Sequence, residues 1–380
     1  MHSYPAPGAD HFSLFNPRRK RHAADMSAST AGHPDYTFAS DNAAGLAPES
    51  AAAVAAANVA SAPSYGDDDW SARAREAIGR IFETPCEVFF VFNGTAANAL
   101  ALAQFCRSYQ SIVCHACSHV DTDECGAPEF FTGGSKIIPV AGPGAKLRVA
   151  ELEPVFWRAH GVHFPRPGVL SLTQATEWGT VYTPDEVRAL AAAAKASGLA
   201  VHLDGARFAN AAVTLAARGH SPADWTWRAG VDVVCLGGTK NGMSAAEAVV
   251  FFNPDHARGF EFRVKQAGQL AAKQRFASAQ WCAQLEGGAW LRHAGHANAM
   301  ARRLATALRT FPHVKLIAEP EANGVFVELP RAAVEALWAR GWHFHRFIGE
   351  HGYRLMCSWA TAPADVDRLV NELRAVLGAG

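Results

Sequence analysis

Two stretches in the middle of the chain are apolar except for one residue each, and each ends where charged residues begin. One covers residues 199–203, with His202 inside it, and is followed by Asp204 and Arg207; the other covers residues 231–236, with Asp232 inside it, and is followed by Lys240. Apolar runs of this length are typical of strands buried on both faces of a parallel sheet. Open sheets of this kind bind ligands at the carboxyl ends of their strands. We therefore expect the three charged side chains to meet at one edge of such a sheet.

The pattern continues on both sides of this centre as an alternation of strands and helices. Apolar runs predict further strands at residues 88–92, 111–114, 137–140, 169–173 and 248–252. Apolar residues at helical spacing predict helices at residues 48–59, 70–83, 150–157 and 184–197. Strands that alternate with helices indicate an α/β fold with a mainly parallel sheet.

The pattern changes towards the C-terminus. Residues 288–311 predict one long helix, and beyond it short strand-like pieces alternate with two further helices. This indicates a large domain over residues 34–287 and a smaller α+β domain over residues 288–380. We expect residues 34–49 to pack with the smaller domain.

The first 33 residues resemble neither domain. They are rich in Ser, Ala and Pro and carry a basic cluster at residues 18–21, with no apolar segment after it. This pattern is a poor match to a secretory signal. We interpret residues 1–33 as a disordered tail or a wrongly assigned start, with Met26 as the alternative first residue. A nuclear or nucleic-acid role for the cluster is the weaker interpretation.

Composition narrows the classes of function. The 380 residues are 49% hydrophobic and carry a formal net charge of 0. This supports a sizeable core and gives no sign of a nucleic-acid partner. No apolar run approaches the roughly 18 residues of a membrane span. The eight cysteines show no paired disulfide spacing, so we expect a reducing compartment, the cytoplasm.

Asp204 and Lys240 together suit one cofactor, pyridoxal 5′-phosphate. That cofactor takes a lysine amine for its covalent link, and an acid beside its ring nitrogen favours the protonated ring. The glycines before Lys240 would let the backbone approach the ring closely. The competing interpretation is that Asp204 begins a simple turn and Lys240 is a solvated lysine.

A phosphate site is predicted at the first strand–helix junction. The strand at residues 88–92 is followed by Asn93, Gly94 and Thr95, where a helix begins. The free N–H groups and the dipole of a helix N-terminus attract anions. Thr95 is expected either to cap this helix or to donate its hydroxyl to a phosphate.

Cysteines and histidines follow the strand at residues 111–114. A zinc site is one interpretation, with the candidate ligands Cys114, Cys117, His119 and Cys125. No second CxxC or HxxxH pair accompanies them, so we favour no metal. His119, just past a strand end, is better placed to stack on a planar ring. His202, within the central strand, we assign to structure.

Several short motifs follow one another along the chain: Ser40-Asp41, Tyr65-Gly66-Asp67-Asp68, Gly94-Thr95, His119, Val162-His163-Phe164, His202 to Arg207, Lys240 and Tyr353-Arg354-Leu355. In these motifs and their order, the chain from about Tyr36 onwards resembles the low-specificity L-threonine aldolases. These are fold-type-I pyridoxal-phosphate enzymes of the threonine aldolase and beta-eliminating lyase family. The family often has Ser where this chain has Asn93, and Ser and Gly where it has Thr239 and Asn241.

The resemblance implies a role for each motif. The residues that it places around the cofactor are Gly94, Thr95, His119, Asp204, Arg207, Lys240, Lys265 and Lys273. Among these, Lys240 would carry the cofactor, His119 would stack on its ring, and Asp204 would meet its nitrogen. The residues that it places around the substrate are Ser40, Arg207 and Arg354 for the carboxylate and His163 for the hydroxyl. His163 or His119 would act as the base.

The implied activity is cleavage of L-threonine, L-allo-threonine and related β-hydroxy-α-amino acids, such as phenylserine, to glycine and an aldehyde. The alternatives are β-elimination or another amino-acid reaction on the same fold, and a nucleotide-binding α/β protein without pyridoxal phosphate.

The resemblance also implies a homodimer or homotetramer with active sites at the interface. The polar loop at residues 65–68 has no evident partner in the sequence around it, so we expect it to reach a neighbouring chain's site. The alternative is a monomer whose loop covers its own site.

Overall fold

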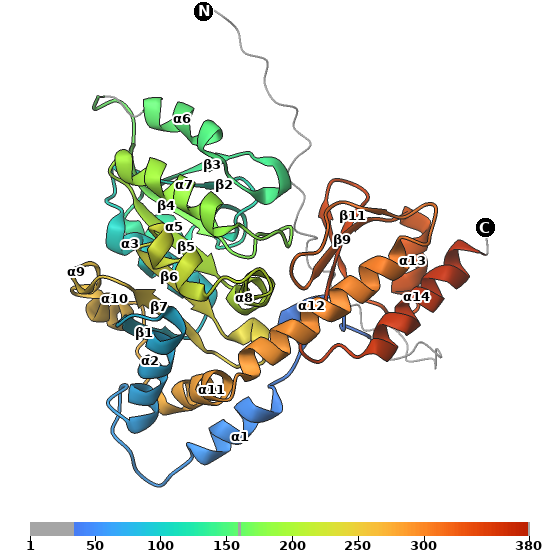
Figure 1. Ribbon diagram of the computed structural model, residues 1–380, viewed down its shortest axis with the longest axis horizontal. Helices are drawn as coiled ribbons and strands as arrows, with labels where there is room; N and C mark the ends of the chain where they lie inside the picture. The colour runs from blue at the N-terminus through green and yellow to red at the C-terminus, as the bar shows by residue number, and fades with distance from the viewer. Residues whose placement is uncertain (1–33, 159–160, 379–380) are drawn as a thin grey trace, which may run out of the picture.

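A computed structural model describes residues 34–158 and 161–378. The tail predicted for residues 1–33 lies outside the described residues. Figure 1 shows two bodies, each built on a β-sheet, with the long helix α12 (Ala289–Leu308) extending from one to the other. No helix in the described residues is long and apolar enough to span a membrane.

The larger body is built on a seven-stranded sheet of order β1-β7-β6-β5-β4-β2-β3. Its strands are β1 (Glu87–Val91), β2 (Gln110–His115), β3 (Lys136–Val140), β4 (Arg166–Thr173), β5 (Ala200–Gly205), β6 (Val233–Gly237) and β7 (Glu247–Phe251). Only β7 is antiparallel to its neighbours, so the predicted mainly parallel sheet is confirmed. Because β7 reverses direction between β1 and β6, β1 runs parallel to β6. The carboxyl ends of β1, β2, β4, β5 and β6 therefore lie at one edge.

Helices cover both faces of this sheet (Figure 1). The helices of this body are α1 (Pro48–Ala56), α2 (Asp69–Phe82), α3 (Gly94–Phe105), α4 (His119–Thr122), α5 (Ala127–Thr132), α6 (Val149–Arg158), α7 (Pro184–Ala196), α8 (Phe208–Ala216), α9 (Pro254–Ala257), α10 (Phe260–Gln266) and α11 (Arg275–Glu286), of which α1 packs on α11. Alternate residues of β6 show the two faces. Val233 and Cys235 pack in a core with α3, whereas Val234 and Leu236 pack in a core with α7 and α8. Burial on both faces explains why these strands are apolar throughout.

The smaller body holds an antiparallel sheet of order β10-β11-β9-β8. Its elements are β8 (Lys315–Leu316), β9 (Gly324–Glu328), β10 (His345–Ile348), β11 (Gly352–Met356), α13 (Arg331–Ala339) and α14 (Pro363–Leu377). Phe38, from the start of the described chain, is fully buried in its core, and the Met356 N–H donates to the Phe38 carbonyl at 3.0 Å.

Helix α12 belongs to both bodies. Trp290 and Ala294, near its start, lie in the core of the larger body, whereas Leu304 and Leu308 lie in the core of the smaller one. The sequence-based boundary between residues 287 and 288 stays a prediction.

Candidate functional site

The shared edge of the large sheet carries most of the residues predicted to react or bind. Strand β5 ends at Asp204, and the strand register places Asp204 beside Thr173 of β4 and Cys235 of β6. Strand β6 leads directly into a short 3₁₀-helix, η5 (Thr239–Asn241), which contains Lys240. The ends of adjacent strands are therefore followed by the three charged residues that we expect to meet, Asp204, Arg207 and Lys240.

Lys240 is half-buried among charged groups. Burial and the positive charge of Arg207 lower its pKa, against the negative charges of Asp41, Asp204 and Glu247. A lowered pKa leaves more of the amine neutral at a given pH, and the neutral amine is the nucleophile. The environment therefore suits Lys240 to covalent chemistry with a carbonyl group.

The packing of the chain accounts for the glycines before Lys240. A Cβ on Gly237 would lie 2.6 Å from the Ala206 carbonyl oxygen, and one on Gly238 would lie 2.4 Å from the Ala246 carbonyl oxygen. The sequence assigned these glycines to the approach of a cofactor ring. In the structure, the packing of the chain against itself already requires them.

Asp204 is buried and held as a hydrogen-bond acceptor. Its Oδ1 accepts from the Ala206 N–H at 2.9 Å, and its Oδ2 accepts from Asn98 Nδ2 at 3.1 Å. Both carboxylate oxygens are therefore held as acceptors at the end of β5, where the N–H of a protonated ring nitrogen could meet them.

His119 begins helix α4 after β2. Its imidazole is 41% exposed, and Nδ1 lies 3.0 Å from the buried Glu124 carboxylate. That hydrogen bond raises the pKa of His119 above its usual value, although burial and the charge of Lys240 act against it. The ring is therefore fixed at Nδ1 and open at Nε2.

Arg207 is clamped by a residue from the start of the described chain. Its Nε and Nη2 donate to the two carboxylate oxygens of Asp41 at 2.7 and 3.0 Å, and Asn323 Nδ2 donates to the same carboxylate at 3.0 Å. Burial alone raises the pKa of Asp41, but the charges of Arg207 and Lys240 lower it to about 2. The bidentate pair fixes the plane of the guanidinium.

Replacing Asp41 by asparagine is expected to destabilise the fold by about 3 kcal/mol in urea unfolding, because it leaves a buried guanidinium without its counter-ion. The depressed pKa of about 2 means that this contribution is complete above the ordinary value of 3.8 and is lost as the pH falls towards 2. The gap between wild type and variant should therefore narrow in acid. Asp367→Asn is the control, because its pair with Arg303 is about half exposed and contributes below about 1 kcal/mol. Equal losses in both variants would contradict the buried-pair account.

Arg354, on β11 of the smaller body, lies near Arg207. Its Nε is buried and has no hydrogen-bond partner among the described residues, and its guanidinium lies over the Phe347 ring at 5.0 Å. Burial and the charge of Arg207 lower its pKa to about 10. Two neighbouring cations with an unused buried donor form a suitable site for an anion, such as the carboxylate of an amino acid.

Ser40 caps the 3₁₀-helix η1 (Asp41–Ala43), and its Oγ accepts from the Asn42 N–H at 3.2 Å. Its hydroxyl hydrogen stays available as a donor. Ser40 directly precedes Asp41, which binds Arg207. This position is compatible with the prediction that Ser40 and Arg207 bind the same substrate carboxylate.

The predicted phosphate site lies at the N-terminus of α3. Asn93, not Thr95, caps this helix, since its side chain accepts from the Ala96 N–H at 2.8 Å. The cap leaves the hydroxyl of Thr95 and the first N–H groups of the helix, at Gly94 and Thr95, without a helical role. A Cβ on Gly94 would meet no atom within 4 Å. The helix N-terminus therefore faces open space that an anion can enter.

Lys265 and Lys273 are not part of this buried cluster. Both are exposed in the single chain, and Lys265 Nζ lies over the Tyr65 ring at 5.0 Å. They lie in the segment around Gln269, whose side chain accepts from the Phe92 N–H at 2.9 Å. They therefore lie close to the phosphate end of the site, but at the surface.

His163 is placed differently from the expectation. It is exposed, three residues before the start of β4 at Arg166, whereas the site lies at the end of β4 beside Thr173. The full length of the strand therefore separates it from the site of its own chain. The motif gave the order along the sequence, but the direction of the parallel strand puts His163 at the opposite edge of the sheet.

His202 and Cys114 have structural environments. His202 is fully buried between Ser171 Oγ (2.9 Å) and Cys235 Sγ (3.2 Å), and burial lowers its pKa to about 4. Burial raises the pKa of the Cys114 thiol to about 12, which disfavours the thiolate that zinc requires. In residues 34–158 and 161–378, no group of three or more His, Cys, Asp or Glu is arranged to hold a metal ion.

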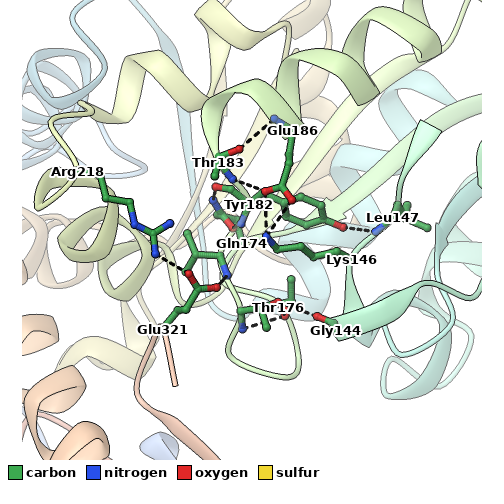
Figure 2. Close-up of polar contacts among 12 residues, drawn as sticks. Gly144, Lys146, Leu147, Gln174, Thr176, Tyr182, Thr183, Glu186, Arg218 and Glu321 are labelled. Carbon is green, nitrogen blue, oxygen red and sulfur yellow. Dashed lines mark hydrogen bonds and ion pairs between the residues drawn. The ribbon is translucent and has the colours of Figure 1, made fainter. Parts of the chain in front are cut away.

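The loop between β4 and α7 brings a further acid to the site, and Figure 2 shows how the loop is held. Gln174 and Tyr182 exchange two hydrogen bonds of 2.9 Å across it. Thr180 Oγ1 donates to the Gly144 carbonyl at 2.7 Å, and the Val181 N–H donates to the Glu321 carboxylate of the smaller body at 2.9 Å. Hydrogen bonds within the loop, to the Gly144 carbonyl and to the Glu321 side chain thus fix it.

Glu177, on this loop, is a residue that the sequence patterns did not single out. One of its oxygens accepts from the His119 N–H at 3.1 Å, and the other is buried without a partner among the described residues. Burial and the charge of Asp204 raise its pKa to about 7. Together with Arg207 and Asn323, it lines a small cavity between the two bodies. Its place just after a buried strand is the only signal that could have found it.

The donors at this edge fit pyridoxal 5′-phosphate. The open helix N-terminus at Gly94 and Thr95 suits its phosphate, the buried Asp204 carboxyl group suits its ring nitrogen, and the Lys240 amine suits its aldehyde. The unused Nε of Arg354 is left for a substrate anion. The phosphate, the ring nitrogen and the aldehyde of the cofactor thus each have a matching group in the described chain.

Comparisons with known proteins agree with this fit. Residues 37–332 match the family described as Beta-eliminating lyase. The chain is 53% identical to the low specificity L-threonine aldolase of Pseudomonas aeruginosa over 91% of this chain and 99% of that protein. It is 52% identical to the low specificity L-threonine aldolase of a Pseudomonas species over 90% and 98%.

A solved structure of the threonine aldolase of Leishmania major superposes with a TM-score of 0.83 at 27% identity, covering 90% of this chain and all of that one. Both the sequence and the fold thus match the same group of enzymes over almost the whole chain. The chain therefore belongs to the low-specificity L-threonine aldolases, the pyridoxal-phosphate-dependent lyases of the beta-eliminating lyase family.

Proposed function

We propose that this chain cleaves L-threonine, L-allo-threonine and related β-hydroxy-α-amino acids, such as phenylserine, to glycine and an aldehyde. The observation that carries this is the cluster of Lys240, Asp204 and two adjacent arginines, one of which keeps a buried donor unused. Such a cluster binds an amino acid by its amine and its carboxylate together.

The residues that would hold the cofactor each act on one part of it. Gly94 and Thr95 would bind the phosphate, Asp204 would accept a hydrogen bond from the ring nitrogen, and Lys240 Nζ would provide the covalent attachment. When bound, pyridoxal phosphate withdraws the electron pair that is released when the Cα–Cβ bond breaks. The Asp204 carboxylate maintains that capacity because it keeps the ring nitrogen protonated.

The substrate is held by its carboxylate. Arg354 and Ser40 have donors available for it, and Asp41 holds Arg207 in a fixed plane beside them. Fixing the carboxylate fixes the rotation about the neighbouring bonds, so that the Cα–Cβ bond points in the direction in which it can break.

The β-hydroxyl proton needs a base, and within one chain this role goes to His119. Glu124 occupies its Nδ1, so Nε2 is the atom that takes the proton, directly or through a water molecule. Because His163 lies at the other edge of the sheet, we do not assign it this role in its own chain.

The reaction is tested by product analysis. The purified protein with pyridoxal phosphate is incubated with L-threonine and, separately, with L-phenylserine. We expect glycine together with acetaldehyde or benzaldehyde in equal amounts. A keto acid and ammonia in place of glycine would mean that the chain is a β-eliminating enzyme, and an unchanged substrate would overturn the proposal.

We further propose a homo-oligomer, at least a dimer and by family resemblance a tetramer, with sites shared between chains. Asp68 is buried and caps α2 through the Ser71 N–H at 2.9 Å, but Tyr65 and Asp67 of the same loop are exposed. Exposed Tyr65 and Lys265 beside the phosphate end of the site leave a surface that a second chain can complete.

Mixing two inactive variants tests the shared sites. Lys240→Ala chains and Tyr65→Ala/Asp67→Ala chains are unfolded together and refolded, with each variant refolded alone as the control. We expect activity to reappear only in the mixture, because some hybrid sites then contain no substituted residue. A monomer in light scattering, or no recovery of activity in proven hybrids, would contradict shared sites.

We also propose a cytoplasmic location, which the eight free thiols support.

A further inference from the structure

A continuous hydrogen-bonded chain joins His119 to Asp204 through two buried residues. His119 Nδ1 lies 3.0 Å from Glu124 Oε1. Asn98 Nδ2 donates to the same Glu124 oxygen at 2.8 Å and to Asp204 Oδ2 at 3.1 Å. Asn98 and Glu124 are only 2% and 3% exposed. The chain therefore links a ring at the mouth of the site to the acid at its base without passing through solvent.

Each member of this chain has a fixed donor or acceptor role. An amide NH₂ carries two hydrogens, so Asn98 can give one to each carboxylate. Both carboxylates must then be acceptors. Because Glu124 Oε1 is an acceptor, the His119 proton sits on Nδ1, and Nε2 is left free. A change in any one group therefore changes what the others can do.

Opposing effects act on the pKa values of Glu124 and His119 in this hydrogen-bonded network. Burial and the nearby charge of Asp204 raise the pKa of Glu124, while the hydrogen bonds from His119 and Asn98 lower it. Glu124 and Asp204 in turn raise the pKa of His119, and the charge of Lys240 lowers it. The neutral Asn98 donates a hydrogen bond to each of the two carboxylates. Without it, Glu124 would lose one of the hydrogen bonds that lower its pKa.

We propose that Asn98 and Glu124 are positioning residues that couple the imidazole of His119 to the carboxylate of Asp204. The coupling sets the tautomer of His119 and keeps a negative charge beneath the cofactor. It rests on the proposed function, because that function places His119 and Asp204 against the cofactor, and it adds two residues that act through them.

The test uses the protein loaded with pyridoxal phosphate and no substrate. The variants are Asn98→Ala, Glu124→Gln and the double variant, and the readouts are cofactor affinity and the pH midpoint of the visible absorption band of the bound cofactor. Each single variant should lower the midpoint by about one pH unit. Glu124→Gln removes a carboxylate near the cofactor, and Asn98→Ala removes a hydrogen bond that stabilises the charged form of that carboxylate. The double variant should shift it no further than the larger single shift, since both changes break one chain.

Asn298→Ala is the matched control. Asn298 is a buried asparagine of α12 whose amide donates to the Asn210 carbonyl of α8 at 3.0 Å and to no carboxylate among the described residues. It should lose stability but keep the wild-type midpoint. If Asn98→Ala does not fold, Asn98→Ser, which keeps one donor, should give a smaller shift in the same direction.

Unchanged midpoints in both single variants, or shifts that add fully in the double variant, would overturn the coupling. A control that shifts as much as Asn98→Ala would do the same. Because no substrate is present, this titration and the product analysis can fail independently.

Discussion

Replacing Lys240 by alanine should abolish the visible absorption band of the bound cofactor and reduce threonine cleavage by at least about 10³-fold. The side chain is half-buried at the end of β6, and its lowered pKa makes it the amine most suited to covalent attachment in the cluster. Alanine removes that amine and leaves the strand and the neighbouring glycines in place. The band is measured by absorption before and after borohydride, and cleavage by aldehyde release.

The control for this variant is Lys315→Ala, because Lys315 is 76% exposed and its nearest acid, Glu328, is 3.9 Å away. It should behave as wild type in both assays. If Lys240→Ala keeps a band that borohydride reduces, or cleaves at the wild-type rate, the assignment of Lys240 is wrong. Circular dichroism establishes that both variants are folded.

Asp204→Asn is expected to bind the cofactor but to cleave threonine about 10²- to 10³-fold more slowly. The substitution keeps the shape and removes the anion, and the loss of a preorganised charge at a reacting group is worth about 3–4 kcal/mol. A second penalty comes from Asn98, because its Nδ2 donates to Asp204 Oδ2 at 3.1 Å and an amide NH₂ at that position would face another donor. The kcat for threonine and the cofactor affinity are measured side by side.

Asp232→Asn is the control, because Asp232 is a buried acid outside the site. Asp232 lies at the amino end of β6, pairs with Lys195 and accepts from the Val201 N–H at 2.7 Å. This variant should lose stability but keep its kcat. A wild-type kcat in Asp204→Asn would remove Asp204 from the ring nitrogen.

The sequence by itself was enough to predict the edge of the sheet and the residues that its strands carry there. Asp204 and Lys240 follow mainly apolar runs, and Gly94 follows another at the start of a helix. Such runs form strands that are covered on both faces, and strands that alternate with helices form a mainly parallel sheet. The carboxyl ends of parallel strands coincide, so the spacing along the chain alone places these residues together.

The apolar pattern did not predict the direction of strand β7, and it did not predict the helices α10 and α11. The apolar run at residues 248–252 predicted a strand, but its direction depends on its partners β1 and β6. The residues of α11 face several other helices, and much of this helix is buried without a simple apolar stripe. Periodicity reports one buried face and says little about a helix surrounded by others.

The contacts that complete the site were decided only by the tertiary structure. Asp41 clamps Arg207 from 166 residues away, and Asn98 reaches Asp204 across 106 residues. Arg354 is left with an unused donor by its burial between two bodies. His163, which a motif had placed at the substrate, lies at the far edge because its strand runs away from it towards the site. Local patterns determine which segments are buried and where they end. They do not determine which side chains from distant segments share a donor, because that depends on how the strands and the two bodies pack together.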